Sequence, residues 1–274
     1  MAAMIARANG AELFYTTRGR GPTCLVPSSI GTTPYEHQMP AALDDRVRLV
    51  FVDLRGSGRS TGSVADLTFE VLAEDLEAVR RAVGVERVAV LGHSALGSLA
   101  FEYACRRPES VSHLVLVGGS ATGDMGELQE RSRAFFEANA APERKQKLAD
   151  NLARLPPGAP PGAAVLAQTP MRFYDADFDG SKAFEGALVK PEVIPYLLGK
   201  LLPGWDAAVA ARSLRAPALI AHGRHDYVVP WTLWEDVVPK LPAATLRLFE
   251  KSGHQPFLEE PEAFADALAA FLAR

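Results

Sequence analysis

Three residues whose side chains together could carry out nucleophilic catalysis each lie just beyond an apolar segment of this chain. Ser94, Asp226 and His254 occur in that order, and each preceding segment is rich in β-branched residues. A serine hydroxyl is a weak nucleophile that needs a base, and the base needs a partner that holds it in one tautomer. The sequence therefore predicts Ser94 as nucleophile, His254 as base and Asp226 as the acid that orients the base.

The residues around Ser94 fit a sharp turn between a strand and a helix. In the G-x-S-x-G motif the nucleophile lies on a strained turn, and its glycines allow strand and helix to approach. Here Gly92 is in place, but Leu96 stands where the second glycine is expected and Gly97 follows one residue later. Alone, the motif fits an ordinary turn equally well. The order Ser, Asp, His favours the triad.

Other residues could fill the roles of acid and base. His222 and His225 are alternative bases, although both lie too near Asp226 in the sequence to be positioned by a separate strand. Asp124 is an alternative orienting acid. Asp226 could instead cap a helix, and His254 could be an ordinary loop histidine.

An acyl-transfer site also needs hydrogen-bond donors for the oxyanion that forms during the reaction. We expect one donor to be the backbone N–H of Ala95, directly after the nucleophile. The other is expected from the loop Pro27–Gly31, where the N–H of Ser29 is the best candidate. The same loop could also be an ordinary polar turn.

Apolar segments alternate with helical patterns and must position these residues. Near-continuous apolar strands suit a parallel sheet covered on both faces, and helices between strands indicate βαβ units. Met4–Arg18 is expected to form a hairpin turning at Asn9-Gly10, at the sheet edge. The predicted fold class is α/β, with a doubly wound, mostly parallel sheet. The expected strands are Cys24–Pro27, Val47–Val52, Arg87–Leu91, His113–Val117, Ala218–Ala221 and Thr245–Phe249, and the expected helices are Thr68–Val83, Leu96–Cys105, Trp231–Leu241 and Pro261 to the C-terminus.

One long stretch interrupts the alternation of strands and helices. Residues 121–212 show no strong strand pattern but contain the helical pieces Glu127–Ala138 and Ala141–Leu155. We predict a helical cap, 121–212, inserted into a core domain of residues 1–120 and 213–274. Its aromatic side chains could line a substrate pocket, although packing within the insertion is the commoner role. The candidates are Phe135, Phe173, Tyr174 and Trp205.

Composition weighs against several classes of function. The net charge of −4 and pI near 5.9 speak against nucleic acid or acidic membranes as partners. Cys24 and Cys105 form no CxxC or Cys/His cluster, so neither a disulfide framework nor a metal site is expected. The N-terminal apolar stretch is too short for a signal peptide, and no segment reaches the length of a membrane span. We expect a cytoplasmic protein acting on a small molecule, with its oligomeric state open.

Four segments resemble the α/β-hydrolases, in particular the prolyl iminopeptidase-like and related esterase group. Asp53–Ser60 resembles the loop after the fourth strand, and Ser94–Ala104 resembles the nucleophile helix. Gly223–Asp226 and Ser252–His254 are similar to the acid and base regions. The resemblance covers roughly residues 10–120 and 213–274. It implies the α/β-hydrolase fold, a helical cap over the active site, the triad and no cofactor.

The expected activity is hydrolysis of an ester, lactone or amide through an acyl-enzyme on Ser94. The substrate is expected to be small to medium and partly apolar. Two departures from the family pattern are Leu96 in the elbow and Pro27-Ser28 in place of the usual His-Gly. Two alternatives follow, since fold does not dictate function. They are a cofactor-free lyase or perhydrolase on the same scaffold, and a ligand receptor without turnover.

Overall fold

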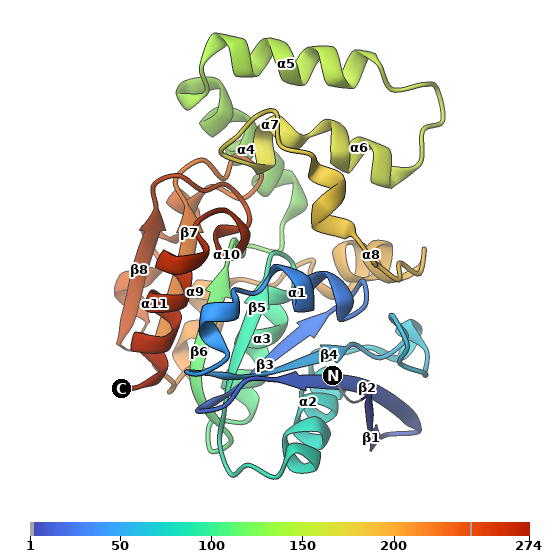
Figure 1. The fold of residues 1–274 in the computed structure, drawn as a ribbon, viewed down its shortest axis with the longest axis vertical. Helices are drawn as coiled ribbons and strands as arrows, with labels where there is room; N and C mark the ends of the chain where they lie inside the picture. The colour runs from blue at the N-terminus through green and yellow to red at the C-terminus, as the bar shows by residue number, and fades with distance from the viewer. Residues whose placement is uncertain (1–2, 242) are drawn as a thin grey trace.

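A single twisted sheet organises the protein. The computed structural model describes residues 3–241 and 243–274, which form an eight-stranded sheet of order β1-β2-β4-β3-β5-β6-β7-β8 (Figure 1). The strands from β4 to β8 in this order are parallel, whereas β2 pairs antiparallel with both of its neighbours, β1 and β4. The predicted α/β class with a doubly wound, mostly parallel sheet is confirmed. The strands are β1 (Met4–Ala8), β2 (Ala11–Arg18), β3 (Thr23–Ser28), β4 (Arg48–Asp53), β5 (Val88–His93), β6 (Val111–Val117), β7 (Ala218–Gly223) and β8 (Ala244–Phe249).

The hairpin predicted at the N-terminus is confirmed, and β1 is an edge strand. Asn9 and Gly10 have φ values of 47° and 74°. This left-handed pair is what a two-residue type I′ turn requires, because its twist matches that of the flanking strands. The antiparallel pair at the edge extends the parallel sheet without a crossover helix.

Helices cover both faces of the sheet and enclose two apolar clusters. One cluster contains Leu25 and Val50, and the other contains Cys24 and Phe51, because successive strand residues point to opposite faces. On the first face lie α2 (Phe69–Val83), α3 (Leu96–Arg106) and α9 (Ala207–Ala210), and on the second lie α1 (Thr33–Gln38), α10 (Pro256–Glu259) and α11 (Pro261–Leu272).

Local signals set some helix boundaries and were overridden at others. Thr68 caps α2 by accepting a hydrogen bond from the Val71 N–H, and Gly84 ends the helix with φ 79°. The predicted helix Trp231–Leu241 is wrong, since the structure has two 3₁₀ turns there, Trp231–Trp234 and Val238–Lys240. Pro239 lacks an N–H and disfavours a helical conformation of the residue before it.

Between β6 and β7 the chain leaves the sheet. We call residues 121–212 the cap segment; that it is a helical cap inserted into a core domain of residues 1–120 and 213–274 stays a prediction. In Figure 1, α4 to α7 lie above one end of the sheet, and α8 lies between them and the strands. An isolated bridge from Thr122 to Asp206 joins the two ends of the segment. Its further helices are α4 (Met125–Asn139), α5 (Pro142–Ala153), α6 (Pro161–Ala167), α7 (Thr169–Arg172) and α8 (Val193–Tyr196).

Candidate active site

Ser94 lies on the turn from β5 to α3 in a strained backbone conformation. Its φ of 56° falls in the left-handed region, which non-glycine residues seldom adopt. The Ser94 N–H donates to the Val117 carbonyl at 2.9 Å, which ties the turn to β6. A side chain on Gly92 would come within 2.3 Å of the Leu96 carbonyl, so only glycine allows β5 and α3 to approach this closely. This is the backbone geometry of a nucleophile elbow.

Leu96 does not occupy the crowded part of this turn. Its side chain is buried and packs in an apolar cluster that also contains Val193 and Leu197 of the cap segment. The close contact is made instead by Gly97, where an added side chain would lie 3.3 Å from the Gly119 Cα. The departure from the G-x-S-x-G spacing thus links the elbow to the cap segment and leaves the turn intact.

Asp226 and His254 form a buried hydrogen-bonded pair at the carboxyl ends of β7 and β8. Asp226 Oδ2 accepts a hydrogen bond from His254 Nδ1 at 2.7 Å, and both side chains are almost completely buried. Asp226 Oδ1 accepts from the N–H groups of Val228 and Val229 at 3.0 and 2.9 Å. Because Nδ1 carries the hydrogen, the lone pair of neutral His254 lies on Nε2, the nitrogen available as a base.

Gly118 and Gly119, directly after β6, lie between Ser94 and this pair. A side chain on Gly118 would come within 2.9 Å of the His254 carbonyl and 3.3 Å of Asp226 Oδ2. A side chain on Gly119 would lie 3.6 Å from the Ser94 carbonyl. The sequence analysis missed both residues, although two glycines directly after a strand are a visible signal of close packing. The structure therefore brings all three predicted residues to one rim of the sheet.

The Ser94 hydroxyl and His254 are not hydrogen-bonded to each other in the described part of the chain. Within residues 3–241 and 243–274, Ser94 Oγ makes no hydrogen bond to His254, while His254 keeps its bond to Asp226. In free enzymes such catalytic hydrogen bonds are commonly long and tighten only in the substrate complex.

His93 contacts the backbone of His254, the candidate base. Its ring is buried, with Nε2 3.0 Å from the His254 carbonyl oxygen and Nδ1 2.9 Å from the Tyr35 hydroxyl. A carbonyl only accepts, so Nε2 carries the hydrogen and Nδ1 accepts from Tyr35. Burial, together with the nearby His254, lowers the pKa of His93 well below its usual range. A neutral His93 thus holds the backbone of His254 in place.

The alternative acid and bases occupy other positions. Asp124 caps α4 by accepting hydrogen bonds from the Gly126 and Glu127 N–H groups. His222 is buried and donates from Nε2 to the Gly119 carbonyl at 3.2 Å, and burial lowers its pKa to about 4. His225 lies with Nδ1 3.3 Å from the Tyr227 hydroxyl. In the part of the chain that the structure describes, only His254 among the histidines hydrogen-bonds to Asp226.

The two predicted oxyanion donors, the backbone N–H groups of Ser29 and Ala95, are free to bind a ligand. Among the described residues, the N–H groups of Ser29 and Ala95 donate to no protein acceptor. Ser28 Oγ donates to the Gly31 carbonyl at 2.6 Å and accepts from the Ile30 N–H at 3.2 Å, which holds the Ser29 loop in shape. An unpaired N–H on the nearly buried Ser29 is costly unless a ligand or water accepts from it.

Two of the predicted pocket aromatics, Phe173 and Tyr174, lie near residues 252–254. We call this loop, which carries the candidate base His254, the base loop. The Phe173 Cα would be 3.0 Å from a side chain on Gly253, next to His254. The Phe173 ring is buried and packs on Phe178 at 4.4 Å between centroids. Tyr174 is 43% exposed, and its ring meets that of His225 edge-on. Both residues are therefore placed beside the loops of the candidate triad.

The other two predicted pocket aromatics, Phe135 and Trp205, pack against aromatic side chains outside the cap segment. Phe135 packs at 5.7 Å on Tyr227, which follows Asp226 in the chain. Trp205 packs at 5.7 Å on Phe101 of α3, and its Nε1 donates to Glu102 at 3.0 Å. Trp205 belongs to the main core cluster on the α3 face of the sheet, and its hydrogen bond fixes it to that helix.

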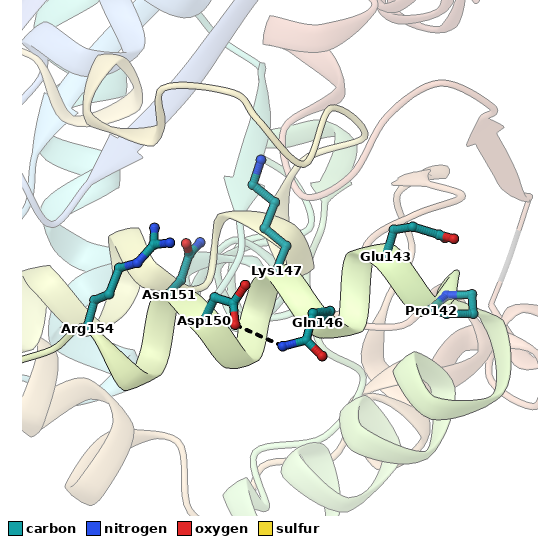
Figure 2. Close-up of a pocket in the computed structure, with 7 residues that line it drawn as sticks. All are labelled: Pro142, Glu143, Gln146, Lys147, Asp150, Asn151 and Arg154. Carbon is teal, nitrogen blue, oxygen red and sulfur yellow. Dashed lines mark hydrogen bonds between the residues drawn. The ribbon is translucent and has the colours of Figure 1, made fainter.

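Two hollows lie on the cap segment. Figure 2 shows one of about 660 Å³, lined by a polar face of α5 and sharing no residue with the candidate triad. A second, of about 390 Å³, lies between α4 and α5 and has Met171 among its lining residues.

The cap segment is hydrogen-bonded directly to the loops that carry Asp226 and His254. The Tyr227 N–H donates to the Met171 carbonyl at 3.0 Å, and the His254 N–H donates to the Arg172 carbonyl at 2.6 Å. A side chain on Gly253 would come within 2.2 Å of that same Arg172 carbonyl. The sequence analysis missed these contacts, because nothing local in residues 171–172 indicates them.

Glu259 joins the same two regions through its carboxylate. Oε1 accepts from the Tyr174 N–H at 2.6 Å, and Oε2 accepts from the Gly253 N–H at 2.8 Å. Burial raises the pKa of Glu259 to about 7, against the opposing effect of these donors and of Gln255. Glu259 is therefore a half-buried carboxylate that joins the loop of Gly253 and His254 to the cap segment.

Glu259→Gln is expected to remove a pH dependence of stability between about pH 4.5 and 7. In this window the unfolded chain has released the Glu259 proton that the folded protein still holds, so raising the pH favours unfolding. The free energy of unfolding of the wild type, relative to the variant, should fall by about 2 kcal/mol across the window. Urea denaturation of both proteins measures it, and a difference independent of pH would contradict the raised pKa.

Two features of the described residues bear on metal binding and on membrane insertion. Residues 3–241 and 243–274 contain no group of three or more His, Cys, Asp or Glu arranged to hold a metal ion. In the same residues, none of the helices has the length and apolar character needed to cross a membrane.

Known proteins resemble this chain in sequence and in fold. A family model described as alpha/beta hydrolase fold matches residues 24–261. The AB hydrolase superfamily protein YclE of Bacillus subtilis is 30% identical over 278 residues, covering 98% of each chain. A 2-hydroxy-6-oxononadienedioate/2-hydroxy-6-oxononatrienedioate hydrolase of Burkholderia vietnamiensis is 28% identical, over 97% of this chain and 93% of its own. The solved structure of an alpha/beta fold family hydrolase from Bacillus anthracis superposes with a TM-score of 0.74 at 22% identity, covering 99% of both chains. The chain belongs to the α/β-hydrolase fold family.

Proposed function

We propose that this protein is a serine hydrolase that cleaves an ester, lactone or amide through an acyl-enzyme on Ser94. The observation that carries the proposal is the left-handed backbone of Ser94, φ 56°, at the end of β5, on the same rim as the buried Asp226–His254 pair. A non-glycine residue is kept in this conformation only where surrounding structure enforces it, and such residues cluster at active sites. Membership of the α/β-hydrolase family supports the same conclusion.

The proposed reaction has two steps. Ser94 Oγ attacks the substrate carbonyl carbon while its proton passes to His254 Nε2, and the carbonyl oxygen takes up negative charge. The N–H groups of Ala95 and Ser29 donate to that oxygen. The tetrahedral intermediate collapses, His254 returns the proton to the leaving group, and the acyl group stays on Ser94. Water, deprotonated by His254, then releases the acid and restores the serine hydroxyl.

The substrate is proposed to be a small or medium-sized molecule with an apolar part. Leu96, beside the nucleophile, belongs to an apolar cluster that continues into the cap segment at Val193 and Leu197. The Burkholderia relative is named as a hydrolase, which fits a hydrolytic role for the shared scaffold. Esters of graded acyl length therefore make the first panel.

A fluorophosphonate probe tests the proposal, because it reacts only with an activated serine. We expect rapid labelling of the native protein, mapped by mass spectrometry to Ser94, together with turnover of p-nitrophenyl acetate and butyrate. Heat-denatured protein is the control and should remain unlabelled. Labelling at another residue, or tight ligand binding without labelling or turnover, would contradict the proposed mechanism and favour a receptor.

A further inference from the structure

Arg172, the last residue of α7, is anchored at the candidate active site by its backbone. Its carbonyl accepts the hydrogen bond from the His254 N–H at 2.6 Å. The same carbonyl lies against Gly253, where a side chain would approach to 2.2 Å. The guanidinium therefore extends from a backbone that is already in contact with the base loop.

The guanidinium of Arg172 has no partner in the described part of the chain. It makes no ion pair or hydrogen bond there, and its Nε atom is buried with no hydrogen-bond partner. The neighbouring Arg144, by contrast, donates to the carbonyls of Pro170 and Phe173 at 2.7 and 2.8 Å. Arg172 as a whole is half-buried, but its buried Nε–H is a polar group that costs free energy unless an acceptor reaches it.

The charge of Arg172 acts within the candidate active site. It contributes to the lowered pKa of His93, and the Asp226 carboxylate favours the charged form of Arg172. Asp226 is not its hydrogen-bond partner, because the Asp226 oxygens accept from His254, Val228 and Val229. Burial lowers the pKa of Arg172, yet a guanidinium stays protonated in proteins. The site thus holds a positive charge that no side chain in residues 3–241 and 243–274 pairs by a salt bridge or hydrogen bond.

Building on the proposed function, we infer that Arg172 binds a carboxylate of the substrate, so that the hydrolase prefers esters or amides that carry an acid group near the scissile bond. The planar guanidinium matches a carboxylate in two-point hydrogen bonding. It supplies one positive charge, which balances a monoanionic carboxylate more closely than a dianionic phosphate. A carboxylate of the bound substrate would accept the hydrogen bond that the buried Nε–H of Arg172 does not make within the described residues.

Two matched esters test this inference. The p-nitrophenyl monoester of glutaric acid carries a carboxylate, and p-nitrophenyl pentanoate is a neutral ester of the same chain length. We expect the wild type to prefer the glutarate ester in kcat/KM by roughly 10- to 100-fold, the range for a charge-assisted hydrogen bond. In Arg172→Met the ratio should fall to near one, and in Arg172→Lys it should be intermediate. Arg154→Met removes one positive charge from α5, lining the hollow of Figure 2, and should leave the ratio as in the wild type.

A binding measurement separates failure of this inference from failure of the proposed function. Free glutarate should raise the melting temperature of the wild type more than valeramide does, since a ligand that binds only the folded state stabilises it. The glutarate effect should be lost in Arg172→Met. Turnover without preference for the carboxylate ester would overturn the role of Arg172 and leave the hydrolase intact. Absence of turnover with an Arg172-dependent glutarate shift would overturn the hydrolase and leave the anion site. If Arg172→Met does not fold, Arg172→Lys and the wild-type glutarate shift still decide the question.

Discussion

Replacing Ser94 by alanine or by glycine is expected to lower kcat for ester hydrolysis by about 10⁴- to 10⁶-fold, as loss of the nucleophile does in other triads. The two variants should differ in stability, because φ at Ser94 is 56°. Alanine keeps the Cβ atom and with it the strain of the left-handed conformation, whereas glycine relieves it. The free energy of unfolding of Ser94→Gly should therefore exceed that of Ser94→Ala by about 1 kcal/mol.

Burst-phase kinetics with p-nitrophenyl esters and urea denaturation measure the two effects. Ser63→Ala makes the same chemical change at an exposed turn and is the control, with kcat close to that of the wild type. Equal kcat values for the wild type and Ser94→Ala would remove Ser94 from the mechanism. Equal stabilities of the alanine and glycine variants would show that the backbone at this position is not strained.

Asp226→Asn is expected to lower kcat by about 10⁴-fold while leaving the fold in place, as the same change does in the triad of serine proteases. Oδ1 of Asp226 accepts two hydrogen bonds, from the Val228 and Val229 N–H groups. In asparagine the amide oxygen must therefore take that position, and the NH₂ group faces His254 Nδ1. A donor there obliges Nδ1 to accept, which places the ring hydrogen on Nε2. His254 then has no lone pair for the serine proton.

Kinetics together with ¹⁵N NMR of the histidine side chains would test this prediction, because the two tautomers have distinct nitrogen shifts. The control is Asp124→Asn, since Asp124 caps α4 and is the alternative acid. That change should cost at most about 1 kcal/mol of stability, the value of a helix cap, with activity retained. Loss of activity in Asp124→Asn but not in Asp226→Asn would reverse the assignment of the acid.

Much of the fold could be predicted because its signals are local. The hairpin at Asn9-Gly10 depends on neighbouring residues alone, and its prediction is confirmed. The ends of α2 are local in the same way, because Thr68 and Gly84 cap the helix. Parallel strands read as apolar runs because both faces of the sheet are covered. The predicted helix Trp231–Leu241 failed for a local reason too, since Pro239 outweighed the apolar pattern.

The candidate triad could be predicted from strand ends. Parallel strands place their carboxyl ends at one rim, so polar residues that follow β5, β7 and β8 must lie near one another. His254 was distinguished from His222 and His225 only by its separate strand. The structure adds the physical reason, which is that His254 alone among them hydrogen-bonds to Asp226 in the described residues.

For Ser94, Asp226 and His254 the sequence by itself determined the order, the strand ends and so the chemistry that the rim of the sheet can perform. Only the tertiary structure decided what surrounds them. Arg172 lies 82 residues before His254 in the chain, yet it holds the backbone of that residue and brings an unpaired charge to the site. Glu259 and Gly118 act in the same way, through contacts between distant segments. Such contacts have no local periodicity or turn chemistry, because burial and charge pairing arise only when the cap segment packs on the sheet.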